Sequence, residues 1–279
     1  MTGFLEFNAT YEEADIVFRG VPYDGTATFK PGSRFAPDAA RTASHGLEGY
    51  SPYQNKTLRE FRICDYGDVF LPFGNTERIM DIIESDAREI LSKGKRLLSC
   101  GGEHLVSYPI IKAHLELYPD LKIIHFDAHT DLRDKYLGEK LSHATVFRRV
   151  CEHTSSRNLY QFGMRCGRKE EFIWGRENTN FFPFTLDEYA ETINTIPRDT
   201  PLYITLDVDV MDPSFFPGTG TPEPGGVTFH ALHDALLKLQ EYNVVGADIV
   251  ELAPDYDPSG VSSITTAKLI RELALLLTK

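Results

Sequence analysis

The chain has 279 residues, of which 42% are hydrophobic and 25% are charged, proportions typical of a globular protein that can bury a sizeable core. Its 29 Lys and Arg against 41 Asp and Glu give a formal net charge of −12, which argues against a nucleic-acid partner and is compatible with a cationic substrate. No apolar run reaches the ~18 residues of a membrane span, no signal pattern opens the chain and no CxxC pair occurs, so we expect a cytoplasmic protein with reduced cysteines and no membrane partner.

Short apolar segments alternate with segments of helical periodicity along the chain. The expected strands are residues 16–19, 61–64, 96–100, 121–126, 158–163, 203–206 and 244–250. The expected helices are residues 75–94, 104–117, 143–152, 228–242 and 262–277. Strands that alternate with helices predict a parallel sheet covered on both faces. No linker divides the chain, so we expect a single three-layer α/β domain over residues 1–279.

The helix at 75–94 has the clearest signals at its ends. Asn75 or Thr76 can cap its start, and Gly94 can end it. Its apolar face comprises Ile79, Ile82, Ile83, Ala87, Ile90 and Leu91. Thr228 is a similar N-cap candidate for a later helix. Two Pro- and Gly-rich stretches, residues 21–37 and 211–226, are interpreted as long functional loops.

Acidic and imidazole side chains directly follow four of the expected strands. The carboxyl ends of parallel strands lie along one edge of a sheet, where ligand sites form. So many buried carboxylates would repel one another unless cations neutralised them. The residues concerned are His104, Asp127, His129, Asp131, Asp207, Asp209 and Glu251.

Each of these motifs alone has an ordinary explanation. An isolated DxHxD is usually a solvated loop, a single His after Gly-Gly is often a cap, and Glu251 alone could be a surface acid. Besides Glu251, they place two imidazoles and four aspartates at strand ends, which favours two divalent ions of the manganese type. No thiolate-rich set that would suit zinc accompanies them.

The stretches GGEH, DAHTD, LDVDVMDPSFFPGTGTPEPGG and DIVELAP, in this order, resemble the signatures of the ureohydrolases, the arginase and agmatinase superfamily. The resemblance extends from KPGSRFAPDAAR to the last helix. It implies a mostly parallel sheet of about eight strands and two Mn²⁺ ions per chain. It further implies that one ion is held by His104 and Asp131, the other by His129 and Asp209, and that Asp127 and Asp207 bridge them.

The resemblance also implies the chemistry. A hydroxide shared by the two ions would attack the carbon of a substrate guanidinium, with Asp131 hydrogen-bonded to the hydroxide. Glu251 would pair with the guanidinium and orient its carbon. His143, in the stretch LSHATVFRR, would carry a proton to the leaving amine. Relatives assemble as trimers or hexamers, so we expect a homo-oligomer.

The stretches GYSPY, LPFGN, GGEHLVS and DAHTDLR resemble the short bacterial agmatinases and favour cleavage of agmatine to putrescine and urea, a step of polyamine biosynthesis. Glu223 is a candidate partner for the distal ammonium of agmatine, or else a solvated turn acid. Arg133 favours a carboxylate substrate such as guanidinobutyrate, unless its side chain points to Asp134 or to solvent. Arginase, guanidinobutyrase and formimidoylglutamase activities remain alternatives, as does a metal-binding relative without catalysis.

The remaining histidines are given structural interpretations. We expect His125 to be a core or supporting residue within its strand. We expect His230 and His233 to be structural because no carboxylate partner is evident nearby. Packing or surface roles are expected for His45, His114 and His153.

Overall fold

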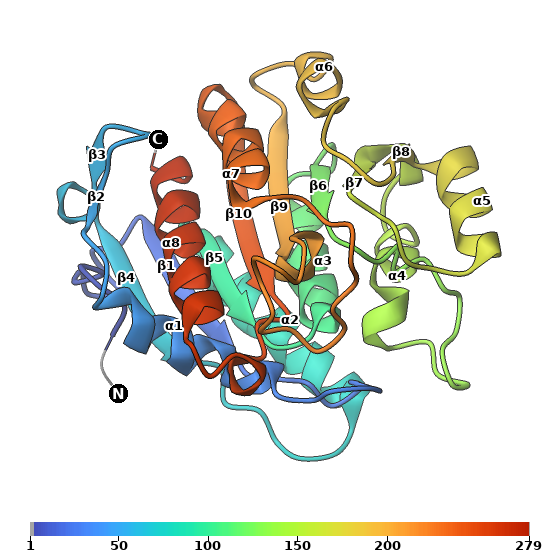
Figure 1. Ribbon diagram of the computed structural model, residues 1–279. Helices are drawn as coiled ribbons and strands as arrows, with labels where there is room; N and C mark the ends of the chain where they lie inside the picture. Colours follow the sequence, from blue (N-terminus) through green and yellow to red (C-terminus); the bar gives the residue numbers. More distant parts are fainter. Residues whose placement is uncertain (1–2, 279) are drawn as a thin grey trace.

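The computed structural model describes residues 3–278, which surround an eight-stranded sheet (Figure 1). Its strands run in the order β4-β1-β5-β10-β9-β6-β7-β8, and every neighbouring pair is parallel. Their bounds are β1 (Ile16–Val21), β4 (Ile63–Asp68), β5 (Arg96–Gly101), β6 (Lys122–Phe126), β7 (Leu159–Phe162), β8 (Asn180–Phe182), β9 (Pro201–Asp207) and β10 (Asn243–Val250). Two short strands, β2 (Tyr50–Ser51) and β3 (Lys56–Thr57), form a separate antiparallel pair.

Helices cover both faces of the sheet (Figure 1). One face carries α1 (Ala36–Ser44), α6 (Tyr189–Asn194), α7 (Phe229–Leu237) and α8 (Val261–Leu276). The other carries α2 (Thr76–Ser92), α3 (Ser107–Leu117) and α4 (Val146–Val150), while α5 (Lys169–Asn178) contacts β8 at the sheet edge. Strand side chains alternate between two apolar cores: Ile16 and Phe18 join the core beneath α8, and Val17 joins the core beneath α2. The predicted three-layer α/β fold is therefore confirmed.

The seven strands predicted from apolar runs are all present, with boundaries shifted by a few residues. The strand β8 was missed because it has three half-buried residues at the sheet edge. Three helices, α1, α5 and α6, were also missed. The stretch 21–37 is therefore not all loop, since α1 begins at Ala36 with Pro37 in its first turn. Three of the predicted helices include 3-10 turns, namely η3 (His104–Val106), η4 (His143–Thr145) and η7 (Lys238–Glu241).

The predicted signals at the helix ends are present. The Asn75 side chain accepts a hydrogen bond from the backbone N of Arg78 at 2.9 Å, and Thr228 accepts one from Ala231 at 3.2 Å. Gly94, just beyond α2, has a φ of 72°, which glycine adopts without a steric penalty. Among the helices of residues 3–278, none has both the length and the apolar character needed to cross a bilayer.

The strands that carry the predicted site residues are neighbours in the sheet, in the order β5-β10-β9-β6. Their carboxyl ends form one continuous edge. The loop after β1 is fixed across this edge because the backbone N of Gly102 donates to Val21 O at 2.9 Å and that of Glu103 to Tyr23 O at 2.8 Å. A Cβ on Gly102 would lie 1.9 Å from the Tyr23 carbonyl oxygen, so only glycine permits this approach.

Candidate active site

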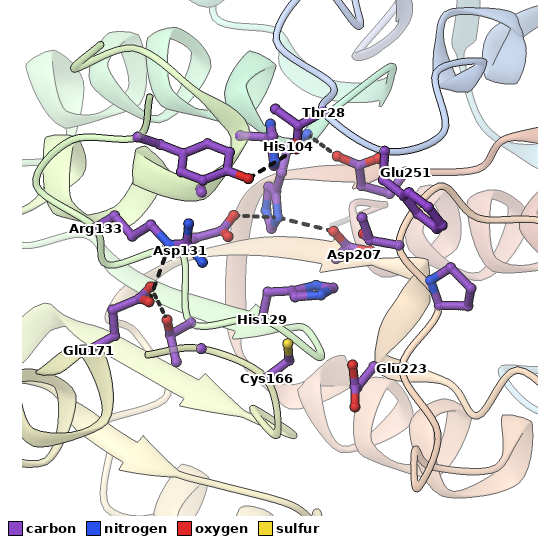
Figure 2. A pocket seen from close by; sticks show the side chains of 18 residues that line it. Thr28, His104, His129, Asp131, Arg133, Cys166, Glu171, Asp207, Glu223 and Glu251 are labelled. Atoms are coloured by element: carbon purple, nitrogen blue, oxygen red, sulfur yellow. Dashed lines mark hydrogen bonds and ion pairs between the residues drawn. The ribbon is translucent and has the colours of Figure 1, made fainter. Parts of the chain in front are cut away.

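The carboxyl ends of β5, β6, β9 and β10 open into a cavity of about 340 Å³. Most of the predicted site residues line it, namely His104, His129, Asp131, His143, Asp207, Glu223 and Glu251 (Figure 2). The other two, Asp127 and Asp209, are buried and contact His129. The structure thus brings together all nine residues that the sequence predicted for the site.

The imidazole of His104 lies at the centre of three carboxylates. Its Nδ1 atom is 3.1 Å from Oδ2 of Asp127, 3.3 Å from Oδ2 of Asp207 and 3.4 Å from Oδ2 of Asp131. Figure 2 shows the ring between Asp131 and Asp207. This Nδ1 is buried and has no hydrogen-bond partner among the described residues.

The other nitrogen of His104 determines where the ring carries its proton. Nε2 lies 2.9 Å from Oγ1 of Thr205, and the Thr205 hydroxyl donates to Oδ1 of Asp248 at 2.7 Å. Because the single Thr205 proton is used on Asp248, Nε2 donates to Thr205, and a neutral ring has its lone pair on Nδ1. Burial opposes protonation of His104, but contacts with Asp127 and Asp207 outweigh it and hold the pKa of His104 well above its ordinary value, so the site attracts positive charge at Nδ1. A lone pair that faces three acidic oxygens is stable when a cation lies between them, so the donor set fits a divalent metal ion.

A second group of donors surrounds His129. Its Nδ1 lies 3.0 Å from Oδ2 of Asp209 and 3.4 Å from Oδ1 of Asp127. The ligand atoms of Asp127, His129 and Asp209 lie within 4.8 Å of one another, as do those of His104, His125 and Asp127. Asp127 therefore belongs to both groups. His125 contacts Asp127 through Nε2 at 2.8 Å and is buried, in agreement with its predicted supporting role.

The carboxylates of this edge cannot all be ionised without positive charge. Burial followed by the charge of Asp127 raises the pKa of Asp131 well above its ordinary value, and burial with the charge of Asp209 does the same for Asp207. Burial also opposes ionisation of Asp127, but contacts with three histidines outweigh it and hold the pKa of Asp127 well below its ordinary value. Positive charge supplied by a metal would allow the whole set to ionise.

Two site residues have left-handed backbone conformations that non-glycine residues rarely adopt. The φ angles are 50° for Asp131 and 68° for Glu251. Backbone hydrogen bonds hold both: Phe147 N donates to Asp131 O at 3.1 Å, and Glu251 N donates to Gly102 O at 2.9 Å. This backbone conformation therefore directs the two carboxylates into the cavity.

The Glu251 carboxylate is fixed against the β5 end. Its Oε1 accepts a hydrogen bond from the backbone N of His104 at 2.8 Å. Burial raises the pKa of Glu251 to about 7, and the charges of Asp209 and Asp127 add to the rise, against the effect of the His104 hydrogen bond. A guanidinium bound beside Glu251 would restore its charged form.

His143 lies at the start of η4 and lines the cavity. Its Nδ1 is 3.3 Å from the hydroxyl of Thr26, and the edge of its ring packs against Tyr136 with a centroid separation of 5.5 Å. Burial lowers the pKa of His143 to about 4. The imidazole is therefore neutral at neutral pH and can accept a proton.

Arg133 lies on the cavity wall and is already paired. Its Nε is 3.3 Å from Oε2 of Glu171, and its guanidinium lies over the Tyr136 ring at 4.4 Å from the centroid. The suggestion that Arg133 turns to Asp134 or to solvent is therefore wrong. Asp134 pairs instead with Arg149 at 2.8 Å.

Glu223 lies on the wall of the cavity near Cys166 (Figure 2). Its backbone carbonyl accepts a hydrogen bond from Nη2 of Arg165 at 2.7 Å, which fixes the loop. Within residues 3–278, its carboxylate has no hydrogen bond or ion pair. The carboxylate is thus available to a ligand.

Some residues outside the predicted site differ from expectation. His233 is buried with Nε2 3.8 Å from Oε2 of Glu272, so the expectation that no carboxylate lies nearby is wrong. His230 is exposed and His114 is buried in the core, as a structural role requires.

Several cavity residues were missed by the sequence analysis, namely Thr28, Tyr136, Cys166, Glu171 and Thr221. All but Glu171 lie outside the regular helices and strands, where no periodic pattern marks a residue. Glu171 carried a local signal, because it stands three residues after Arg168 at the start of α5 and its carboxylate accepts from the Arg168 backbone N at 2.7 Å.

Comparison with known proteins agrees with this geometry. A family model described as the Arginase family matches residues 14–276. The chain is 46% identical over 275 residues to the agmatinase of Bacillus anthracis, covering 98% of this chain and 95% of that protein. It is similar to a crystal structure from Clostridium difficile, of a protein provisionally described as an agmatinase, with a TM-score of 0.93, 42% identity and coverage of 96% of this chain and 99% of that one. The agmatine ureohydrolase of Thermoplasma volcanium gives a TM-score of 0.90 at 30% identity, with coverage of 99% and 94%.

Proposed function

The chain belongs to the arginase family, and on this premise we propose that it hydrolyses agmatine to putrescine and urea. It is a hydrolase that acts on amidines, like the agmatinases it resembles over nearly its whole length. One observation carries the proposal: the buried Nδ1 of His104 faces three carboxylate oxygens at the floor of a cavity whose wall bears an unpaired acid, Glu223.

Two Mn²⁺ ions per chain are proposed for this centre. His104 and Asp131 would hold one ion, His129 and Asp209 the other, and Asp127 and Asp207 would contribute to both. The contacts of Asp127 with both imidazoles support its shared role. When bound, the ions would activate water at neutral pH as the nucleophile for the guanidinium carbon.

The side chains around the proposed metal centre would bind the substrate, orient the water and move the proton. Glu251, held by the His104 backbone N, would bind the substrate guanidinium and orient its carbon. Asp131 would accept a hydrogen bond from the attacking water and fix its direction. His143, neutral at neutral pH, would take up a proton and deliver it to the amine as the carbon–nitrogen bond breaks.

The wall of the cavity favours a cationic tail. Glu223 offers a carboxylate without a protein partner to the distal ammonium of agmatine. The charge of Arg133 is already compensated by Glu171, which reduces its attraction for a carboxylate tail. Hydrolysis of guanidinobutyrate is the second candidate activity, because Arg133 nevertheless lines the same cavity.

Four further properties are proposed from the family resemblance. The chain would form one ureohydrolase domain over residues 1–279 and assemble as a homo-oligomer, either a trimer or a hexamer. It would act in the cytoplasm and supply putrescine for polyamine biosynthesis.

A direct assay tests the proposed activity. The protein is loaded with Mn²⁺ and incubated with agmatine, and urea and putrescine are measured together. We expect both products in equal amounts from the wild type, and a large loss in a His143→Ala variant that keeps its metal. Absence of urea from a fully loaded wild-type protein would rule out the proposal.

A further inference from the structure

Thr26 and Glu103 form a hydrogen-bonded pair beside the cavity that the functions proposed above do not use. The Glu103 side chain is 0% exposed. It accepts a hydrogen bond from the Thr26 backbone N at 2.8 Å through Oε2, and one from the Thr26 hydroxyl at 2.5 Å through Oε1. The backbone bonds of Gly102 and Glu103 to the loop after β1 bring these two residues together. Glu103 therefore holds the Thr26 hydroxyl in one orientation.

The Thr26 hydroxyl in turn contacts His143 twice. The backbone N of His143 donates to Thr26 Oγ1 at 3.0 Å, and Nδ1 of the ring lies 3.3 Å from the same oxygen. Thr26 has one hydroxyl proton, which it gives to Glu103, so its oxygen can only accept from the ring. The Ser142 hydroxyl is the other neighbour of Nδ1, but it lies farther away, at 3.5 Å.

The contact determines which nitrogen of His143 carries the proton. With the proton on Nδ1, the lone pair of the neutral ring is on Nε2. Nε2 has no hydrogen-bond partner in residues 3–278, and the ring lines the cavity. A proton taken up there would be placed for transfer to a leaving amine.

We propose that Thr26 and Glu103 are positioning residues that fix His143 with its proton on Nδ1 and Nε2 free toward the substrate. The inference rests on the proposed function, in which His143 moves the proton. In other catalytic sites an acid accepts a hydrogen bond directly from Nδ1 of a histidine and so orients the ring. Here the Thr26 hydroxyl lies between Nδ1 and the acid.

The charged surroundings of His143 make this support important. Burial lowers the pKa of His143 to about 4. A contact with the Thr26 backbone raises this pKa, and the charges that His129, Arg133 and His104 carry when protonated lower it further. The only ring packed against His143 is uncharged, that of Tyr136, among the described residues. The Thr26 backbone opposes loss of the ring proton, and the Thr26 hydroxyl, held by Glu103, positions Nδ1.

Thr26→Val removes the hydroxyl at nearly constant volume, and Thr26→Ser keeps it. We expect Thr26→Val to lower kcat for agmatine about ten- to a hundredfold, with an unchanged metal content and KM. Thr26→Ser should restore kcat. In a His143→Ala background, Thr26→Val should have little further effect, since the two residues act as a unit.

A readout without catalysis separates this inference from the proposed function. Protein loaded with diamagnetic Zn²⁺ is examined by ¹H–¹⁵N NMR of the histidine rings, with His143 assigned by comparison with His143→Ala. We expect the Nδ1–H tautomer in the wild type and in Thr26→Ser, and a mixture or the Nε2–H form in Thr26→Val. An Nε2–H tautomer in the wild type would overturn the inference even if agmatine is hydrolysed. A Thr26→Val effect of equal size with and without His143 would also overturn it.

Discussion

Nδ1 of His104 lies 3.1 Å from Oδ2 of Asp127, both residues are buried, and no hydrogen bond joins the two atoms. The Nε2 proton is committed to Thr205, so in the neutral ring this short approach joins a lone pair to an acidic oxygen. Such a pair is stable when both atoms ligate one cation. The contact therefore supports a metal centre independently of the sequence motifs.

Loss of a shared ligand should remove more than one ion. Asp127→Ala and Asp207→Ala are each expected to lower the metal content by more than one of the two proposed ions, because each carboxylate would serve both. Elemental analysis after gel filtration measures this. Asp134→Ala, which removes an exposed acid of the same region, is the control and should keep the full content. A single tightly held ion that survives Asp207→Ala would contradict the binuclear centre.

Removal of the His143 imidazole should impair turnover far more than metal binding. General acid–base catalysis contributes about 10²–10⁴-fold to rates, so His143→Ala should lower kcat by a factor in that range. Steady-state kinetics and elemental analysis on the same samples check this. A variant as active as the wild type between pH 7 and pH 9 would exclude His143 from the reaction.

His114 should make folding stability fall in acid. Burial lowers its pKa to about 4, whereas the unfolded chain binds a proton at its ordinary value near 6.5. Between these values the unfolded state holds the extra proton, so stability present above pH 6.5 is lost as the pH falls toward 4. At pH 5.5 the protonation of His114 in the unfolded chain lowers the free energy of unfolding by about 1 kcal/mol.

Urea unfolding at pH 7.5 and pH 5.5 measures this contribution. The His114→Gln variant should lose about 1 kcal/mol less than the wild type on acidification. His230→Gln, which changes an exposed histidine, should lose as much as the wild type. Equal losses in all three proteins would show that His114 does not titrate between the folded and unfolded states as proposed.

Glu223 should contribute to recognition of the substrate tail. A charge-assisted contact with the distal ammonium is worth roughly 1.5–3 kcal/mol, so Glu223→Gln should lower kcat/KM for agmatine about ten- to a hundredfold with an unchanged metal content. Butylguanidine, which lacks the ammonium, is the matched control substrate and should be hydrolysed equally by both proteins. An equal loss with butylguanidine would show that Glu223 acts on the fold and not on the tail.

The sequence predicted the strands and the metal-ligand candidates well because each ligand follows an apolar strand. Asp127, for example, comes directly after β6, and Asp207 is the last residue of β9. The order of these strands in the sheet depends on packing between distant segments, which no local pattern encodes.

Contacts between loops could not be predicted from the sequence for the same reason. Thr26 and Glu103 are 77 positions apart and Arg133 and Glu171 are 38 apart, so their pairing exists only in the folded chain. The left-handed backbone of Asp131 and Glu251 was equally hidden, because glycine is the residue that usually signals this conformation.

The most direct test of the account is kcat/KM for a panel of guanidino compounds after Mn²⁺ loading. The guanidinium end is common to agmatine, arginine and guanidinobutyrate, so discrimination must come from the wall that carries Glu223 and Arg133. We predict that agmatine exceeds both competitors by about tenfold or more. If guanidinobutyrate is instead the best substrate, and Arg133→Ala abolishes that preference, the agmatine assignment is wrong and Arg133 determines specificity.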